Sequence, residues 1–330
     1  MPGWNRSQPN NFMKIFHGYR DIKDKLNDPV VAIGMFDGVH LGHKKVLKKV
    51  LSHRGRDRVV MTFDPHPQKV VSPDKTPPRI MSLEHRLRIL ERMGLDAAVV
   101  VNFTDFIAMM PPEEFVKRVI HGIGARKVYV GDNFHFGRAQ SGGTEDLKTI
   151  GKKYDIEVFA VEPVKVGRRV VSSTWLRELI RSGRLSMAEK LLRRPVTVMG
   201  TVVRGEERGR ELGFPTANID PHHEVMPPPG VYAVKINIEG KLHDGVVNVG
   251  FKPTFYGSKL RRRKEPYVEV HLIGYKGHLY GRDLEVFFVK KLRNEKKYRT
   301  TEALIRQIGK DIEKAHSLLE RDDLIRKISR

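Results

Sequence analysis

The stretch VVAIGMFDGVHLGHKKVLKKVL, residues 30–51, decides the fold of the N-terminal half of the chain. It opens with a β-branched apolar run, Val30–Ile33, and closes with apolar residues at helical spacing, so it predicts a strand, a turn and a helix start. The helical apolar positions are Val46, Leu47, Val50 and Leu51. His40 and His43 stand at this helix start, where unpaired N–H groups and the helix dipole attract a phosphate. The segment favours nucleotide chemistry over the alternative of two surface histidines at a helix cap.

The composition is that of a globular protein with room for two domains. Of its 330 residues, 39% are hydrophobic and 30% charged, so the chain can bury substantial cores. It has no cysteine, which excludes disulfides and thiolate chemistry and fits a reducing compartment. The N-terminus lacks an apolar leader and no apolar run reaches the ~20 residues of a membrane span, so we expect a cytoplasmic protein with no membrane partner.

The formal net charge of +22 suits either a polyanionic partner or phosphorylated substrates. The basic residues come in short groups with little aromatic interleaving, which is typical of a solvated surface: Lys44, Lys45, Lys48 and Lys49, and residues 261–264. We therefore expect no specific binding of nucleic acid.

Residues 30–165 alternate apolar runs with amphipathic stretches. The runs are nearly continuous, as expected of strands covered on both faces, and lie at residues 30–33, 59–63, 97–101, 127–130 and 158–161. Helices are predicted at residues 83–93, between Ser82 as N-cap and Gly94 as stop, and at 113–120, between Pro112 and Gly122. This βαβα order predicts an α/β fold with a doubly wound parallel sheet, whose ligand binds at the carboxyl ends of the strands.

Polar segments follow three of these strands. FDGVHLGH (36–43) follows the first, DPHP (64–67) the second and GDNFHFG (131–137) the fourth. Because the carboxyl ends of parallel strands meet at one edge of the sheet, the segments predict a single site.

The pattern changes after Arg177. A short helix is predicted at residues 185–192, ended by Pro195, and is followed by alternating runs at 196–203, 231–238, 245–249, 267–273 and 284–290. These short strands predict an antiparallel β-barrel, closed by a helix that begins at Thr300 or Thr301 and carries Leu304, Ile308, Ile312, Ala315 and Leu319 on one face. We therefore expect domains at residues 12–184 and 196–322, joined by a linker helix at 185–195.

Several motifs in this order carry a family resemblance: FDGVHLGH, DPHP, GDNFHFG, VSSTWLREL (171–179), RGRELGFPTANI (208–219), VNVGFKPTF (247–255), VEVHLIG (268–274) and LYGRDLEVFFVKKLRNEKKY (279–298). Together they closely resemble the bacterial bifunctional riboflavin kinase/FMN adenylyltransferase family, the FAD synthetases, over nearly the whole chain. The resemblance implies a Rossmann-like nucleotidyltransferase domain followed by a riboflavin kinase barrel. It implies the substrates riboflavin, FMN and ATP, the products FMN, FAD, ADP and pyrophosphate, and Mg²⁺ as cofactor.

In the N-terminal domain the resemblance implies attack of the FMN phosphate on the α-phosphorus of ATP, with no protein nucleophile. Alignment and charge stabilisation would then carry the catalysis. His40 and His43 match the family's H-x-G-H motif and would hold the triphosphate. The other implied ATP contacts are Gly34, Phe36, Asp37 and Gly42 in the same segment, and Ser172, Ser173, Thr174 and Arg177 in S-S-T-x-x-R.

The resemblance assigns flavin contacts to His66, Asn133 and Phe136, although His66 also reads as an ordinary turn histidine. GDNFHFG departs from the pattern of many relatives, which have Asp at position 133, Arg at 135 and a basic residue near 140. Asn133 can still hydrogen-bond to a flavin or a ribose.

In the C-terminal domain the resemblance implies transfer of the γ-phosphate of ATP to the 5′-hydroxyl of riboflavin. No Walker A sequence is present. Thr216 and Asn218 of PTAN match the family's Mg²⁺ and phosphate positions, and Glu269 matches its general base. The remaining implied ATP contacts are Gly205, Gly209, Gly213 and Pro215, and Arg293 is the implied flavin contact.

Three alternatives remain at this stage. One half of the chain could be active and the other a binding module; the fold could serve another nucleotidyl acceptor, which leaves the PTAN barrel unexplained; or a basic nucleic-acid-binding protein could have kept an enzyme fold. If His40→Ala and Glu269→Ala each abolish a different one of the two reactions, the enzyme is bifunctional and the first alternative is excluded. Affinity that falls steeply with salt, without flavin turnover, would favour the last.

Overall fold

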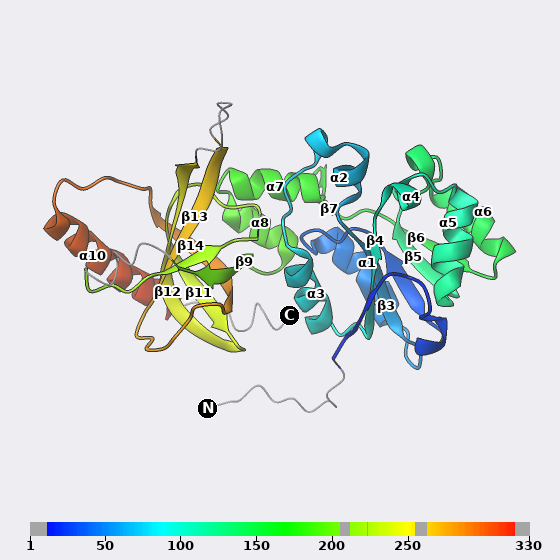
Figure 1. Cartoon of the computed structure of the whole chain (residues 1–330), viewed down its shortest axis with the longest axis horizontal. Coiled ribbons are helices and arrows are strands. Elements are labelled where there is room, and N and C mark those ends of the chain that lie inside the picture. Colours follow the sequence, from blue (N-terminus) through cyan, green and yellow to red (C-terminus); the bar gives the residue numbers. More distant parts are fainter. Residues whose placement is uncertain (1–11, 205–211, 223, 255–262, 321–330) are drawn as a thin grey trace. The chain divides into compact units, whose positions relative to one another are not determined.

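A computed structural model of the chain describes residues 12–204, 212–222, 224–254 and 263–320. Its contacts divide the chain into two compact units: residues 1–77 with 83–171, and residues 78–82 with 172–330. The first unit holds a parallel sheet and the second a closed antiparallel barrel, so the predicted fold class is confirmed (Figure 1). Over the described residues, no helix is both long and apolar enough to cross a bilayer.

The sheet of the first unit is wholly parallel, in the order β1-β4-β3-β2-β5-β6. Its strands are β1 (Lys14–His17), β2 (Val30–Ile33), β3 (Arg58–Asp64), β4 (Ala97–Asn102), β5 (Lys127–Gly131) and β6 (Glu157–Val161). The five predicted strands are confirmed, and β1 is an additional edge strand. Every residue of β2 is buried, as expected for the centre of a sheet covered on both faces.

Helices connect these strands: α1 (Leu41–Leu51), α2 (Pro67–Val71), α3 (Leu83–Arg92), α4 (Asp105–Ala108), α5 (Pro112–Phe115) and α6 (Thr144–Lys153). The predicted helix at 83–93 is confirmed. The one predicted at 113–120 begins as α5 and continues as a wider π-helical turn, Val116–Ile120. A short hairpin of β7 (Lys165–Val166) and β8 (Arg169–Val170) ends the unit.

The strand order places the switch point of the sheet beside β2. From β2 the chain moves to β3 and β4 on one side, and then crosses to β5 and β6 on the other. Doubly wound sheets bind their ligands at such a switch point, so the carboxyl end of β2 is the expected position of the site. The segments FDGVHLGH and GDNFHFG follow β2 and β5 at this point.

The barrel of the second unit closes in the order β10-β13-β12-β11-β14-β9, with every pair antiparallel. Its strands are β9 (Val196–Val203), β10 (Ala217–Asp220), β11 (Gly230–Ile238), β12 (Lys241–Thr254), β13 (Arg263–Leu272) and β14 (Asp283–Arg293). The predicted strands are confirmed and β10 is an addition. Where β9 meets β10, a Cβ on Gly200 would collide with the carbonyl oxygen of Asp220, so only glycine allows this approach.

Helices α7 (Ser173–Arg181) and α8 (Leu185–Leu192) precede the barrel, and α10 (Thr301–Leu319) packs against β11, β12 and β14. Of the two predicted caps of the last helix, Thr300 is the one observed: its hydroxyl accepts a hydrogen bond from the backbone N–H of Ala303 at 3.2 Å. The described contacts group α7 with the barrel unit. This division by contacts differs from the predicted domain boundary near residues 184–195, which stays a prediction.

Residues 78–82 come from the connection before α3 but belong to the barrel unit. The Pro78 carbonyl accepts a hydrogen bond from Arg177 Nε at 2.8 Å. Ser82 N–H donates to the buried carboxylate of Glu224 at 2.7 Å, and the Arg79 carbonyl accepts from the N–H of Val225 at 2.8 Å. This segment is therefore held by residues that follow it by about a hundred positions or more.

Candidate active sites

The start of α1 carries the two predicted histidines in direct contact. His40 is the N-cap, and its Nδ1 accepts a hydrogen bond from His43 N–H at 3.4 Å, which leaves the proton of the neutral ring on Nε2. The two rings stack with centroids 3.7 Å apart. A Cβ on Gly42 would lie 3.2 Å from the His40 ring, so glycine gives that ring its place. The structure thus brings together both histidines at a helix start.

The turn before α1 packs against the ring of His43. Phe36 is buried and meets the His43 ring edge-on at 5.3 Å, and Gly34 leaves room for the Phe36 ring. Asp37 is also buried. Burial lowers the pKa of His43 well below its usual 6.5, and electrostatic interactions with His40 and Arg86 lower it further. His43 is therefore neutral at pH 7 until an anion offsets these effects.

The predicted flavin contacts differ in their placement. His66 caps α2 through a 3.2 Å hydrogen bond from Gln68 N–H to its Nδ1, and Asn133 is exposed in the loop after β5. Phe136 is only 6% exposed and packs in the core against Phe115 and Phe134. This burial argues against direct contact between Phe136 and a flavin, because its apolar ring serves the core instead.

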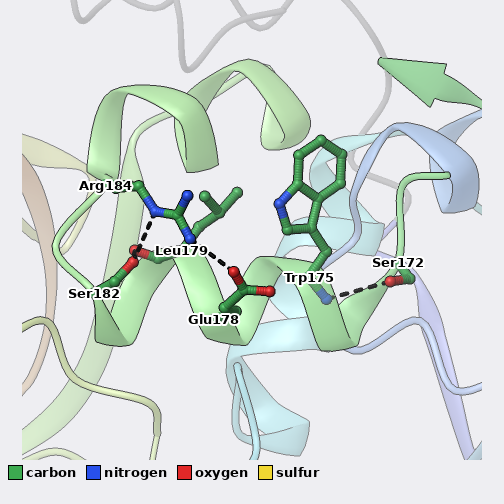
Figure 2. A network of polar contacts seen from close by, with 6 residues as sticks. All are labelled: Ser172, Trp175, Glu178, Leu179, Ser182 and Arg184. Atoms are coloured by element: carbon green, nitrogen blue, oxygen red, sulfur yellow. Dashed lines mark hydrogen bonds and ion pairs between the residues drawn. The ribbon is translucent and has the colours of Figure 1, made fainter. Parts of the chain in front are cut away.

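The S-S-T-x-x-R segment forms the start of α7 and belongs to the second compact unit. Figure 2 shows Ser172 as its N-cap, accepting a hydrogen bond from Trp175 N–H at 3.2 Å. Its hydroxyl proton stays available to a phosphate oxygen. Thr174 is exposed and Ser173 half-buried, whereas Arg177 is buried with its Nε on the Pro78 carbonyl. Arg177 thus has a structural bond that its sequence motif did not reveal.

A cavity of about 730 Å³ in the second unit gathers four of the predicted kinase residues: Thr216, Asn218, Glu269 and Arg293. The cavity also has an apolar lining, here called the apolar wall, which comes partly from α10. The apolar wall consists of Leu212, Phe214, Val231, Val246, Leu304, Ile308 and Ile312. One cavity therefore offers a carboxylate and neutral oxygens beside a surface suited to a large apolar ring.

Strand register brings three polar residues of the larger cavity together. Asn218 on β10 and Asn248 on β12 both stand directly opposite Glu269 on β13. Side chains paired in this way lie on the same face about 5 Å apart. The carboxylate of Glu269 is therefore flanked by an amide on each side, and Asn248 is a site residue that we did not predict.

Tyr267 is another unpredicted residue of this cavity. Its hydroxyl donates to the carboxylate of Glu295 at 2.7 Å, and Gly250 leaves room for its ring. Burial and this hydrogen bond raise the pKa of Tyr267 to about 12, so the phenol keeps its proton at pH 7.

Arg293 lies on the cavity wall but is bound to Asp311 of α10. Its Nε and Nη2 both reach the Asp311 carboxylate at 2.8 Å, and Gln307 donates to the other oxygen at 3.0 Å. Asp311 is 5% exposed. This ion pair ties the end of β14 to α10, which carries part of the apolar wall.

A second cavity of about 430 Å³ shares Thr216 and His271 with the first. His271 lies two residues beyond Glu269 on β13, and its Nδ1 is 2.9 Å from the carbonyl oxygen of Pro215. Because a carbonyl only accepts, that nitrogen carries the proton. PTAN therefore forms the wall between the two cavities, and His271 holds its first residue.

Three glycines were predicted as ATP contacts of the kinase, and the structure describes one of them. Gly213 has φ +84°, a conformation that favours glycine, whereas Gly205 and Gly209 lie outside the described residues. Among the described residues, no group of three or more His, Asp or Glu could hold a metal ion. Thr216 and Asn218 nevertheless offer the oxygen donors that Mg²⁺ accepts when phosphates supply its other ligands.

Comparison with known proteins covers both units. Residues 22–175 match the FAD synthetase family and residues 192–319 the riboflavin kinase family. The bifunctional riboflavin kinase/FMN adenylyltransferases of Bacillus subtilis and Escherichia coli K12 are each 34% identical to the chain, over 91% of its length and 96% of theirs. A solved Streptococcus pneumoniae structure, described as a macrolide-efflux protein, superposes with a TM-score of 0.77 at 28% identity, covering 92% of this chain and 99% of that one.

Proposed function

This chain belongs to the bifunctional riboflavin kinase/FMN adenylyltransferase family, and from that premise we propose which of its residues perform each reaction. The barrel unit phosphorylates riboflavin to FMN with ATP. The segments after β2, β3 and β5 serve the transfer of the adenylyl group from ATP to FMN, which yields FAD and pyrophosphate. The ATP contacts of Ser172, Ser173, Thr174 and Arg177 stay predictions.

In the kinase step the isoalloxazine ring lies against the apolar wall of the larger cavity, and the ribityl chain extends toward Glu269. Glu269 takes the proton from the 5′-hydroxyl, whose oxygen attacks the γ-phosphorus of ATP, and ADP leaves. The observation that carries this proposal is the row of Asn218, Glu269 and Asn248 beside that wall.

ATP occupies the smaller cavity in this proposal. Because Thr216 belongs to both cavities, phosphates held along PTAN reach toward Glu269. When bound, Mg²⁺ would neutralise charge on the phosphate oxygens, with Thr216 and Asn218 as its protein ligands. His271 keeps PTAN in place through Pro215.

In the adenylyl step an oxygen of the FMN phosphate attacks the α-phosphorus of ATP. His40 and His43 bind the polyphosphate at the start of α1, where the N–H groups and helix dipole add to them. Polyphosphate favours the charged imidazole and so raises the low pKa of His43, which strengthens its hydrogen bond as charge develops. The cytoplasmic location and the absence of a nucleic-acid partner stay predictions.

One time course tests the assignment. The purified chain is incubated with riboflavin, ATP and Mg²⁺, and in parallel with FMN, and the flavins are separated by chromatography. We expect FMN before FAD in the first reaction. We also expect His40→Ala to stop FAD formation while FMN accumulates, and Glu269→Ala to stop FMN formation while FAD still forms from FMN. A variant that leaves its own step intact would refute the role assigned to that residue.

A further inference from the structure

A buried arginine beneath the adenylyl site has no part in the mechanism above. Arg86 lies in the first turns of α3 and is only 3% exposed. A guanidinium carries five donors and is always charged, so burying it is costly unless hydrogen bonds replace those to water. A buried arginine therefore indicates a position that the structure uses. Its hydrogen bonds indicate where it matters.

Arg86 binds backbone oxygens of two adjacent strand ends. Its Nη1 donates to the carbonyl of Met35 at 2.7 Å, and its Nη2 donates to the carbonyl of Phe63 at 3.3 Å. Met35 follows β2 and Phe63 lies at the end of β3. The Met35 carbonyl also accepts the hydroxyl of Thr62, a fully buried residue, at 3.2 Å. Two side chains therefore fix one carbonyl at the switch point of the sheet.

That carbonyl precedes a turn of unfavourable backbone shape. Phe36 has φ 51° and Val39 has φ 42°, which are left-handed values that a β-branched residue rarely adopts. The turn ends at His40, the cap that stacks on His43. Such a turn persists only where its surroundings over-determine it, and the fixed Met35 carbonyl supplies one such restraint.

The charge of Arg86 also reaches the histidines, since it contributes to the low pKa of His43. It therefore adds positive potential at the place where a polyphosphate would bind.

We propose that Arg86 is a positioning residue for adenylyl transfer: by holding the Met35 carbonyl together with Thr62, it keeps the turn at residues 36–39 in the shape that presents His40 and His43 to the polyphosphate of ATP. This rests on the proposed role of the two histidines. It is distinct from that role, because Arg86 acts through the backbone and lies below the turn.

The test compares Arg86→Met and Thr62→Val with the controls Arg88→Met and Thr62→Ser. Arg88 lies half-exposed on the same helix and pairs with Glu84, and serine keeps the hydroxyl at position 62. FAD formation from FMN is the main readout, and FMN formation from riboflavin by the same preparation reports the state of the barrel unit. Circular dichroism and the melting temperature report whether the first unit of each variant is folded.

We expect kcat for FAD formation to fall roughly 10- to 100-fold in Arg86→Met, and by less in Thr62→Val, because small displacements of aligned groups are costly. The kinase step should stay near wild type in both, and both controls should keep both steps. The basic limb of the FAD-forming pH profile should move to higher pH in Arg86→Met alone, since only that variant removes a charge that lowers the pKa of His43, whose protonated ring binds the polyphosphate.

Wild-type FAD formation in folded Arg86→Met, or a parallel loss of both steps in Arg86→Met with a wild-type circular dichroism spectrum and melting temperature, would overturn the proposal. If Arg86→Met does not fold, Thr62→Val decides alone: activity equal to that of Thr62→Ser would also overturn it. His40→Ala is measured beside these variants. If His40→Ala keeps FAD formation, the proposed role of the histidines fails; if it loses FAD formation while Arg86→Met does not, only the present inference fails.

Discussion

Replacing Glu269 by glutamine tests the kinase mechanism at its centre. The substitution keeps the shape of the side chain and removes only its ability to take a proton. Glu269 is half-buried on the cavity wall with Asn218 and Asn248 opposite it, and both amides can hydrogen-bond to a glutamine amide. The barrel should therefore fold as before.

The expected effect follows from this geometry. A positioned general base contributes about 10²- to 10⁴-fold, or roughly 3 to 5 kcal/mol of activation free energy. We expect Glu269→Gln to lower kcat of FMN formation by that factor with little change in the KM for riboflavin, because the apolar wall is untouched. A second cavity carboxylate, Glu295, accepts a hydrogen bond from Tyr267, so Glu295→Gln should cost less than about tenfold.

The assay follows FMN appearance from riboflavin, and FAD formation from FMN by the same preparation is the internal control. A loss smaller than tenfold in Glu269→Gln, or equal losses in the Glu269 and Glu295 variants, would refute the assignment of the base. The first result would mean that solvent or another group takes the proton. The second would mean that the cavity requires negative charge and not a base at one position.

Three further predictions concern stability. The folded-state pKa of His43 lies below the unfolded value of 6.5, so neutral His43 contributes fully to the free energy of unfolding above pH 6.5. This contribution is lost as the pH falls below 6.5, by at most about 1.4 kcal/mol per pH unit. The free energy of unfolding, measured with urea at pH 7.5 and 5.5, should therefore differ less between the two pH values in His43→Gln than in the wild type. Gly200→Ala should lower the free energy of unfolding by roughly 1–3 kcal/mol through its collision with Asp220, and an unchanged denaturation midpoint would contradict this. Asp311→Asn weakens the ion pair with Arg293 and should lower the free energy of unfolding by about 1.5–3 kcal/mol, which a lower melting temperature of the barrel would show. Asp311→Glu keeps the charge and should recover part of this loss.

The elements that were predicted correctly are those whose burial shows in the sequence. Buried parallel strands such as β2 are short β-branched runs, and barrel strands such as β9 are bounded by Gly and Pro turns. The missed elements lack that signal. Strand β1, KIFH, is a largely exposed edge strand, and β10, ANID, lacks an apolar run because two of its four residues are polar. Helix α6 contains Gly151, which weakens a helical pattern, yet a Cβ there would lie 2.9 Å from the carbonyl oxygen of Ile156.

The sequence predicted the motif residues of the candidate sites but not the residues that the fold brings next to them. His40, Thr216 and Glu269 stand out by residue type and order. Asn248 becomes visible only through the register of β12 on β13, because cross-strand partners are far apart in sequence. The family resemblance assigned Phe136 as a flavin contact, and only the packed core reveals its burial.

The path of residues 78–82 constrains the order in which the protein can take shape as it is made. The Pro78 carbonyl finds its partner 99 residues later in Arg177, and the N–H of Ser82 finds its partner 142 residues later in Glu224. On a ribosome that adds about 5–20 residues per second, these groups wait several seconds or more after they are synthesised. The segment between α2 and α3 therefore acquires its final bonds late, from a part of the chain that does not yet exist when the first strands of the sheet emerge.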